Sequence, residues 1–277
     1  MEVIEKINEI KTYRLKLTEP IGFVPTMGYL HQGHLSLIRR SRAENLSVVI
    51  SIFVNPTQFS SGEDFDSYPR DTECDLALLE KEGADVVFMP SAREIYPPQF
   101  DSWVVVDKLA QRLEGANRPG HFRGVATVCA KLFNIVKPTR AYFGQKDAQQ
   151  VAVIKKMISD LNMNLKIITL PTVRESDGLA ISSRNSYLNH KERQAATILY
   201  RALTLTQKLW SEGERDAHRL RQEMTSLLKK EPLVKIDYVS IADRETLNEL
   251  TQIISPALAS LAVKIGSTRL IDNIVLK

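Results

Sequence analysis

The sequence has little cysteine, and its two cysteines lie far apart. Cys74 and Cys129 show no metal-ligand spacing, and each falls within a helix-like pattern. Thiols in such patterns are most often buried and reduced. We therefore expect two buried thiols, no cysteine-based metal site and a reducing compartment, the cytoplasm.

The chain also lacks long apolar runs and a strong charge of one sign. No apolar stretch approaches the roughly 18 residues of a membrane span. The first residues, MEVIEKINEIKTYRLK, lack the apolar core and small-residue cleavage site of a signal peptide. The 37 basic and 33 acidic side chains leave a net charge of +4, too small and dispersed for a polyanion-binding surface. We expect a soluble protein that binds neither membrane nor nucleic acid.

Apolar runs rich in β-branched residues alternate with helical patterns through the first 170 residues. The 277-residue length and 43% apolar content suit a globular protein of two unequal domains. The expected strands are 21–25, 47–54, 84–90, 140–144 and 165–170, and the expected helices are 34–44, 70–82, 122–136 and 146–161. This order predicts an α/β fold with a doubly wound parallel sheet, which binds ligands beyond the carboxyl ends of its strands.

The pattern changes after about residue 176. Helical stretches near 190–211 and 216–230 precede three expected strands, 234–243, 257–266 and 268–276. They predict a smaller α+β unit. We place the boundary in the polar stretch 174–185, which gives domains 1–175 and 176–277.

The most informative loop follows the first expected strand. Residues 25–41, PTMGYLHQGHLSLIRRS, lead into a helix that begins near Gly33. Gly28 and Gly33 allow a ligand to approach the backbone, and His31 and His34 place ring nitrogens beside the helix N-terminus, where phosphate is favoured. The alternative is a turn whose histidines only cap the helix or fill space.

A second loop, FVNPTQF at 53–59, follows the second expected strand. The neutral amide of Gln58 suits hydroxyl and carboxylate recognition, although such a segment taken alone is more often an ordinary turn. We expect the polar residues 60–71 to form a mobile loop with solvated rather than catalytic carboxylates.

A third loop, NRPGHFRG at 117–124, precedes an apolar helical stretch. Arg118 and Arg123 are able to clamp a phosphate or carboxylate through paired hydrogen bonds. A solvated loop fits the pattern equally well. The role of His121 stays open.

The segment FGQKDAQQ, 143–150, leaves the fourth expected strand and opens a helix. We expect Asp147 to cap this helix. Lys146 stands where the helix dipole disfavours a cation, which indicates a bound anion. Gln150 lies one turn beyond Asp147 and is expected to face the same pocket.

The last motif, PTVRESDGLAISSRN at 171–185, joins the two expected domains. Ser182, Ser183 and Arg184 offer two hydroxyls and a guanidinium suited to a triphosphate, and a plain linker is the alternative. All five motifs fall at expected carboxyl ends of strands, so one crevice is able to contain them.

In this order and spacing, the five motifs resemble those of the pantothenate synthetases, or pantoate–β-alanine ligases, over about residues 21–190. The first and last also resemble motifs of the wider nucleotidylyl-transferase superfamily. The resemblance implies a Rossmann-like N-terminal domain, a smaller C-terminal lid, a homodimer and the use of ATP with Mg²⁺. It implies a ligase that condenses (R)-pantoate with β-alanine through a pantoyl-adenylate, releasing AMP and pyrophosphate.

The resemblance also implies site residues, position by position. His31, His34, Lys146 and Arg184 are the implied catalytic residues, with His34 as the acid. Gln58 and Gln150 are implied to bind pantoate, and Gln58 also β-alanine. The implied ATP contacts are Met27, Gly28, Tyr29, Leu30, His31, Gln32, Gly33, His34, Gly144, Gln145, Lys146, Asp147, Val173, Ile181, Ser182, Ser183 and Arg184. Tyr29 and Ile181 replace a small residue and a methionine that are common in the family, and the metal ligands stay unknown.

Two other functions fit parts of this pattern. A nucleotidylyl transferase of the same superfamily attaches a nucleotide to a phosphorylated acceptor and stops there, but the pair Gln58 and Gln150 favours an uncharged polyol acid. A catalytically silent protein that binds nucleotides or RNA is the other. The net charge of +4 and the full set of polar site residues argue against it.

Overall fold

The first 170 residues form one sheet of six parallel strands in the order β1-β4-β3-β2-β5-β6. The computed structural model describes residues 1–60, 62–254 and 256–277. The strands are β1 (Glu2–Ile4), β2 (Ile21–Thr26), β3 (Ser47–Ile52), β4 (Val86–Phe88), β5 (Arg140–Gly144) and β6 (Lys166–Leu170). The expected parallel sheet is confirmed. The three-residue β1 has no counterpart among the expected strands.

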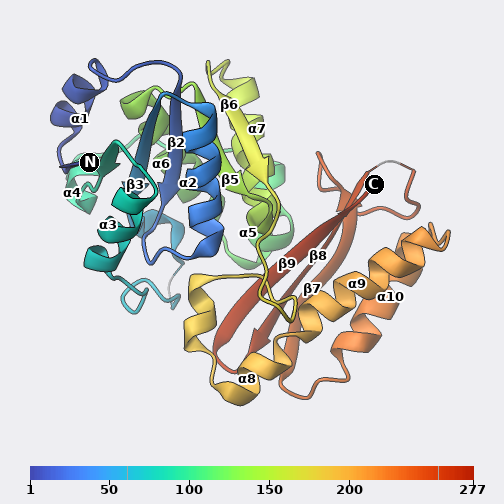
Figure 1. Cartoon of the computed structure of the whole chain (residues 1–277). Coiled ribbons are helices and arrows are strands. Elements are labelled where there is room, and N and C mark those ends of the chain that lie inside the picture. The colour runs from blue at the N-terminus through green and yellow to red at the C-terminus, as the bar shows by residue number, and fades with distance from the viewer. Residues whose placement is uncertain (61, 255) are drawn as a thin grey trace.

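Helices cover both faces of this sheet (Figure 1). They are α1 (Ile7–Arg14), α2 (Gln32–Glu44), α3 (Thr72–Lys81), α4 (Ala92–Ile95), α5 (Leu113–Asn117), α6 (His121–Val136) and α7 (Ala148–Asp160). Neighbouring residues of β2 show how the layers arise, because successive side chains of a strand point to opposite faces. Phe23 packs on Phe133 of α6, with ring centroids 6.3 Å apart, whereas Val24 packs in the cluster with Leu35 and Ile38 of α2. A sheet buried on both faces explains its nearly continuous apolar strands.

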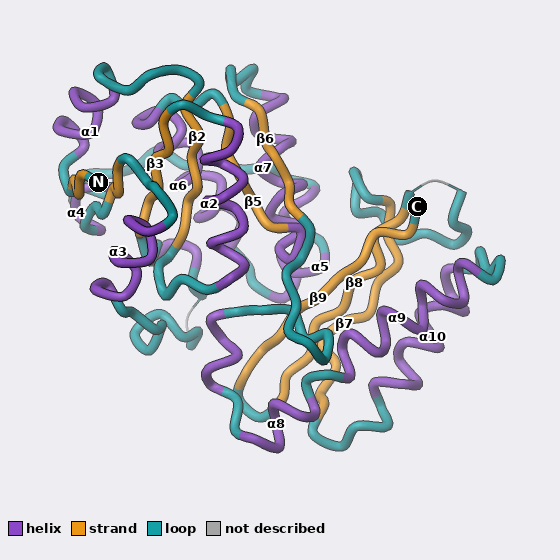
Figure 2. Tube along the Cα trace, viewed as in Figure 1, coloured by secondary structure: helices purple, strands orange, loops and turns teal. Residues whose placement is uncertain are grey.

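The later residues form a smaller antiparallel sheet in the order β7-β8-β9. Its elements are β7 (Val234–Asp243), β8 (Ala257–Ile265), β9 (Thr268–Leu276), α8 (His190–Ala195), α9 (Ile198–Ser211) and α10 (Ala217–Leu228). Helices α9 and α10 pack on one face of the sheet (Figure 2). The expected helical stretch at 190–211 is confirmed, but it divides at Ala196 and Thr197 into α8 and α9. The boundary at residues 175 and 176 lies between the two sheets and stays a prediction.

The centre of the six-stranded sheet determines where a ligand fits. β2 lies between β3 and β5, and the chain moves to opposite sides of β2 as it forms these two neighbours. Connections that diverge in this way leave a crevice at the carboxyl ends of the strands. Four of the five predicted motifs leave β2, β3, β5 and β6 at this edge, whereas the motif at 117–124 joins α5 to α6 and follows no strand, contrary to expectation.

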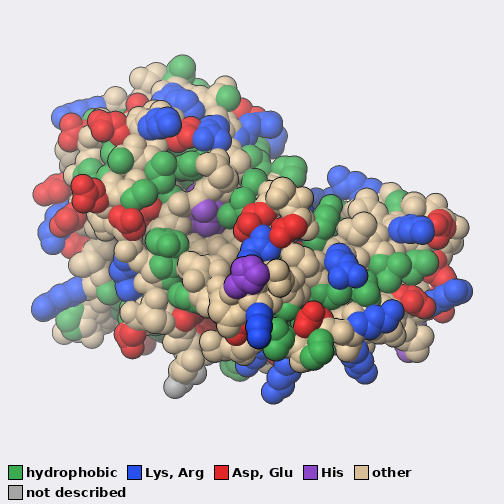
Figure 3. All heavy atoms as spheres, turned by 60° about the horizontal axis from the view of Figure 1, so that its bottom comes forward, with side chains coloured by type: hydrophobic (Ala, Val, Ile, Leu, Met, Phe, Trp, Pro, Cys, Tyr) green, Lys and Arg blue, Asp and Glu red, His purple; other side chains and the backbone are tan. Residues whose placement is uncertain are grey.

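Surface features test three further expectations. Cys129 is buried in α6, as expected, but Cys74 is exposed, because α3 buries Asp75 and Leu79 and turns Cys74 outward. No described helix is long and apolar enough to cross a membrane. On the face drawn in Figure 3, basic and acidic side chains are interspersed.

Candidate active site

A cavity of about 230 Å³ opens at the carboxyl ends of β2 and β5. Most of the predicted site residues line it. They are Met27, His31, Gly33, His34, Gln58, Gly144, Lys146, Asp147, Gln150, Val173, Ile181, Ser182, Ser183 and Arg184. A wider cleft of about 820 Å³ shares Lys146 and Arg184 with this cavity and extends to β9. The five motifs therefore meet in one crevice, as their order in the sequence indicated.

Five predicted ATP contacts do not line this cavity: Gly28, Tyr29, Leu30, Gln32 and Gln145. The backbone N–H groups of Tyr29 and Leu30 each donate to the Asp75 carboxylate at 2.7 Å, so a buried acid of α3 holds this turn. The side chain of Gln32 accepts from Arg39, and that of Gln145 donates to Asn273. Contacts of these five residues with ATP stay a prediction.

His31 and His34 form a stacked pair at the start of α2, with ring centroids 4.0 Å apart. His31 Nδ1 accepts the Gly33 N–H at 3.1 Å, and His34 Nδ1 accepts the His31 N–H at 3.4 Å. A neutral ring that accepts at Nδ1 carries its proton on Nε2. His31 therefore caps the helix, as the alternative interpretation held, and both rings also line the cavity.

The electrostatic setting keeps both rings neutral near pH 7. Burial, reinforced by the charge of Lys146, lowers the pKa of His31 to about 4. Burial and the neighbouring His31 lower the pKa of His34 to about 3. The pair can thus present neutral N–H donors beside a helix N-terminus, an arrangement suited to phosphate oxygens.

The Gln58 amide is held in place by its own loop. Asn55 Nδ2 donates to Gln58 Oε1 at 3.2 Å, and Gln58 Nε2 lies 3.0 Å from Met27 Sδ. Helix α6 packs closely on this loop, since a Cβ atom on Gly124 would lie 2.3 Å from the Thr57 carbonyl oxygen. Asn55 is 1% exposed and positions the side chain of Gln58. The motif FVNPTQF alone did not indicate this role.

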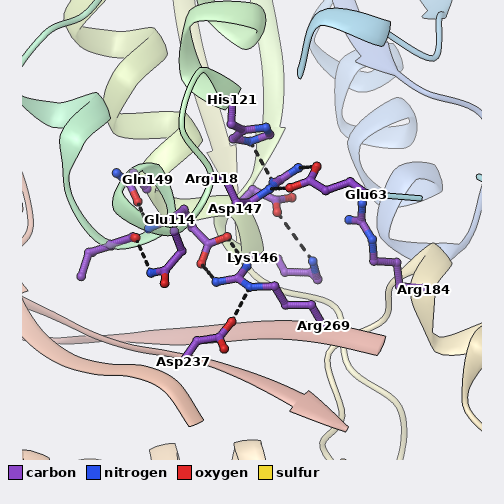
Figure 4. A network of polar contacts seen from close by, with 12 residues as sticks. Glu63, Glu114, Arg118, His121, Lys146, Asp147, Gln149, Arg184, Asp237 and Arg269 are labelled. Carbon is purple, nitrogen blue, oxygen red and sulfur yellow. Dashed lines mark hydrogen bonds and ion pairs between the residues drawn. The ribbon is translucent and has the colours of Figure 1, made fainter. Parts of the chain in front are cut away.

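His121 contacts the backbone of the same loop and also Arg118, beside which it lies in Figure 4. Its Nδ1 lies 2.7 Å from the Gln58 carbonyl oxygen, and Arg118 donates to its Nε2 at 3.1 Å. A neutral ring with its proton on Nδ1 satisfies both contacts, and burial together with the Arg118 charge lowers the His121 pKa to about 4. The expected clamp of two arginines does not form, because Arg123 is exposed and stacks over Trp103 at 4.6 Å.

Two acidic residues that were expected to be solvated form ion pairs with arginines at the cavity. Asp64 accepts two hydrogen bonds from Arg184, at 2.8 and 2.9 Å, and Glu63 pairs with Arg118 at 2.7 Å. Although burial alone would raise it, Arg184 holds the pKa of Asp64 below its ordinary value. The expectation of solvated carboxylates is thus wrong for these two residues. Ser61 of the same stretch lies outside the described residues.

The turn after β5 presents Lys146 and Asp147 to the cavity. Lys146 Nζ lies 3.6 Å from the Asp147 carboxylate, whose side chain is 46% exposed. The Asp147 side chain makes no capping hydrogen bond to α7, so the expected cap is wrong. Gln150, one turn further, does line the same cavity as Asp147.

The segment after β6 forms the opposite wall of the cavity. The Ile181 N–H donates to the Val173 carbonyl at 3.0 Å, which brings these two predicted contacts side by side. The Ser182 side chain accepts the Arg184 N–H at 3.3 Å and caps a short 3₁₀ turn. Tyr68 also lines the cavity and is 6% exposed. A large aromatic residue within the polar run 60–71 was the available signal for it.

A doubly wound sheet whose central crevice joins a helix N-terminus, neutral histidines, a lysine and an arginine is typical of an enzyme that binds a nucleotide through its phosphates. Residues 2–275 match the family model described as pantoate-beta-alanine ligase, and the chain belongs to that family.

Individual relatives agree over the whole chain. The pantothenate synthetase of Roseiflexus castenholzii is 59% identical over 100% of both chains. The crystal structure of pantothenate synthetase from Thermus thermophilus superposes with a TM-score of 0.95 at 45% identity, covering 99% of each chain. The pantoate-beta-alanine ligase of Francisella tularensis, complexed with beta-gamma ATP and beta-alanine, gives a TM-score of 0.82 at 36% identity, covering 99% of this chain and 97% of that one.

Proposed function

We propose that this chain joins (R)-pantoate to β-alanine at the expense of ATP, through a pantoyl-adenylate, and releases AMP and pyrophosphate. The observation that carries the proposal is the composition of one cavity. Groups suited to phosphate, including His31, His34 and Lys146, share it with the two neutral amides of Gln58 and Gln150. Membership in the pantoate-beta-alanine ligase family supports the choice of substrates.

In the first step, an oxygen of the pantoate carboxylate attacks the α-phosphorus of ATP and pyrophosphate leaves. Negative charge grows on the phosphate oxygens, so fixed donors and cations lower the barrier. Lys146, Arg184 and the N-terminus of α2 supply them. We assign His34 the role of a neutral Nε2–H donor rather than of the acid that the resemblance implies, because a ring with a pKa of about 3 carries no spare proton near pH 7.

In the second step, the neutral amine of β-alanine attacks the acyl carbon of the mixed anhydride. The C–N bond forms, the C–O bond to AMP breaks, and the attacking nitrogen loses a proton. Apolar side chains of the cavity wall, among them Phe53, Val125 and Leu132, limit the access of water that would hydrolyse the intermediate. Gln58 and Gln150 hold pantoate through its hydroxyl groups and carbonyl oxygen.

We propose that ATP enters with Mg²⁺, which shields phosphate charge when bound. Among the described residues, no group of three or more His, Cys, Asp or Glu side chains is arranged to hold a metal ion. This donor set fits a cation carried mainly by phosphate oxygens and water, the usual mode for Mg²⁺. Asp147, which lines the cavity, is the proposed protein ligand.

The deciding experiment follows pyrophosphate, AMP and ADP with ATP, Mg²⁺ and pantoate, with and without β-alanine. We expect pantoate-dependent pyrophosphate, and AMP turnover that requires β-alanine. ADP would indicate an acyl phosphate instead. Nucleotide transfer to a phosphorylated acceptor would favour the nucleotidylyl transferase, and ATP binding without turnover would favour the silent binding protein.

Replacement of Lys146 tests the phosphate side of the site. Lys146→Ala is expected to lower the rate of pantoyl-adenylate formation by about 10²- to 10³-fold, because it removes a positive charge from the growing phosphate charge. Lys156→Ala is the matched control, since Lys156 is exposed on α7 and pairs with Asp160. An adenylation rate in Lys146→Ala equal to that of the control would refute the role of Lys146.

The expected homodimer and cytoplasmic location also remain proposals. The segment 101–106, which belongs to no helix or strand, exposes Trp103 and Val105 by 40% and 61%, a feature that supports contact with a second copy. Sedimentation at micromolar concentration is expected to give a dimer that Val105→Asp weakens, and a monomeric parent protein would refute the proposal. The two free thiols support a reducing compartment, which cell fractionation checks.

A further inference from the structure

Strand β9 carries two adjacent polar residues that are almost fully buried. Asp272 is 2% and Asn273 is 4% exposed. Adjacent residues of a strand point to opposite faces of the sheet. Asp272 lies opposite Leu261, a core residue on the side of α9 and α10, and Asn273 lies opposite Ser260. Buried polar side chains need partners, and these two residues have them on the two walls of the active-site cavity.

Asn273 directs its whole carboxamide at the turn that presents Lys146. Its Oδ1 accepts from Gln145 Nε2 at 3.0 Å. Its Nδ2 donates to the main-chain carbonyls of Gln145 at 3.0 Å and of Lys146 at 2.9 Å. A side chain with two donor hydrogens and one acceptor oxygen thus uses all three on two consecutive residues.

Among the described residues, the start of this turn has no side-chain cap. Gly144 has no side chain to cap the 3₁₀ turn Gln145–Asp147, and Asp147 makes no capping hydrogen bond to α7. The turn is therefore held at its carbonyl groups by a residue that lies 127 positions further along the chain. Asn273 holds the main-chain carbonyl of Lys146 itself. The fixed main chain therefore also limits the directions that the Lys146 ammonium group can take.

Asp272 acts in the same way on the opposite wall. Its carboxylate accepts from Arg174 at 2.6 and 2.9 Å, and Arg174 donates in turn to the Gly178 carbonyl at 3.0 Å. This arginine stands next to Val173, at the start of the segment that ends in Arg184. Two neighbouring residues of β9 thus connect both walls of the cavity to one strand.

We propose that Asn273 is a positioning residue for adenylation, acting through the main chain of Lys146. It contacts no substrate in this role. It fixes the turn so that the ammonium group of Lys146 is already in place when charge develops on the phosphate. The inference rests on the proposed function, and a displacement of about 1 Å from a remote change is enough to slow an enzyme about 100-fold.

A double-mutant cycle tests the inference on pantoate-dependent pyrophosphate formation. Asn273→Ala is expected to lower the adenylation rate by about 10- to 100-fold, with little change in the KM for β-alanine. In a Lys146→Ala background, Asn273→Ala is expected to lower the adenylation rate by less than about 3-fold, because the ammonium group that Asn273 positions is absent. Additive effects of the two changes would overturn the inference.

Ser240→Ala is the matched control for lost stability. Ser240 lies in the same row of the sheet as Asn273, is 1% exposed and donates to Glu249 rather than to the site. We expect the Ser240→Ala variant to be less stable than the parent protein but to keep the parent adenylation rate. A comparable rate loss in this control would show that Asn273→Ala acts through stability alone.

Two further measurements keep the outcome clear. Asn273→Ser retains a hydroxyl donor of shorter reach, so it is expected to give a smaller rate loss and replaces the alanine variant if that variant does not fold. A parent protein that forms no pyrophosphate from ATP and pantoate would refute the proposed function itself. An active parent protein with a fully active Asn273→Ser variant and an additive cycle would refute only the inference.

Discussion

The segment 171–185 holds two arginines that each pair with an aspartate, but in different surroundings. On the loop side, Arg184 pairs with Asp64, whose side chain is 21% exposed. On the β9 side, Arg174 pairs with Asp272, whose side chain is 1% exposed. Both pairs are bidentate, with distances between 2.6 and 2.9 Å.

The difference in exposure determines how easily each arginine can separate from its aspartate. A partly hydrated carboxylate can leave its arginine at little cost, because water takes over its solvation. A buried carboxylate cannot, since separation would leave an unpaired charge in a low-dielectric setting. We therefore interpret the loop side as the surface where substrate anions replace Asp64, and the β9 side as the fixed frame.

The largest expected effect is a loss of stability at the frame. Asp272→Ala leaves Arg174 without its buried partner and is expected to lower the free energy of unfolding by about 3–5 kcal/mol. Urea unfolding followed by circular dichroism measures it. Asp64→Ala, the matched change on the loop side, is expected to cost roughly 1 kcal/mol or less. Equal losses in the two variants would remove the distinction between the two ion pairs.

The pH dependence of stability sharpens the comparison, because His121 supports the loop side in its neutral form. Its folded pKa of about 4 lies below the ordinary value of 6.5, so the unfolded chain binds the proton first as the pH falls. Above pH 6.5 the neutral ring therefore does not lower the free energy of unfolding. Between pH 6.5 and about 4 it lowers this free energy progressively.

His121→Gln removes this titration. The stability difference between pH 7 and pH 4 is expected to shrink by roughly 3 kcal/mol relative to the parent protein. The measurement is urea unfolding at a series of pH values. His218→Gln, an exposed change on α10, serves as the control and is expected to keep the parent slope. An unchanged slope in His121→Gln would contradict the assignment of a buried neutral ring.

The smallest expected effect concerns ATP affinity. In the proposed function the Asp64 carboxylate competes with phosphate for Arg184. Asp64→Asn removes this carboxylate, so the Kd for ATP is expected to fall by about 2- to 5-fold, corresponding to about 1 kcal/mol or less. Calorimetric titration measures it. Weaker binding would mean that Asp64 orients Arg184 for the nucleotide rather than competing with it.

The sequence was a good guide where contacts are local. The strands around β2 are short apolar runs that are buried on both faces, and the motifs follow them directly, so parallel topology alone brings His34, Gln58 and Lys146 to one edge. The division into α8 and α9 was not predicted, because Ala196 and Thr197 keep right-handed helical backbone angles and no glycine or proline marks the break.

Contacts between distant segments were not predictable in this way. Asp64 was expected to be solvated because its neighbours are polar, and nothing in the sequence indicates that Arg184, 120 residues away, lies beside it. The exposure of Cys74 depends on which face of α3 meets the sheet, and the helix pattern leaves this ambiguous. Asp272 and Asn273 do interrupt the apolar strand TRLIDNIVL, a signal that such a strand has polar partners on both faces.

In strand β9, the number of residues between the hairpin turn and Asp272 determines the face to which each side chain points. Asp272 and Asn273 serve opposite walls only because odd and even positions of a strand alternate in direction. A single-residue insertion or deletion between the hairpin turn and Asp272 would exchange their directions, presenting a carboxylate to the Lys146 turn and an amide to Arg174. A two-residue change would preserve the directions. Changes in the length of this hairpin are therefore expected to preserve the active site only when they involve an even number of residues.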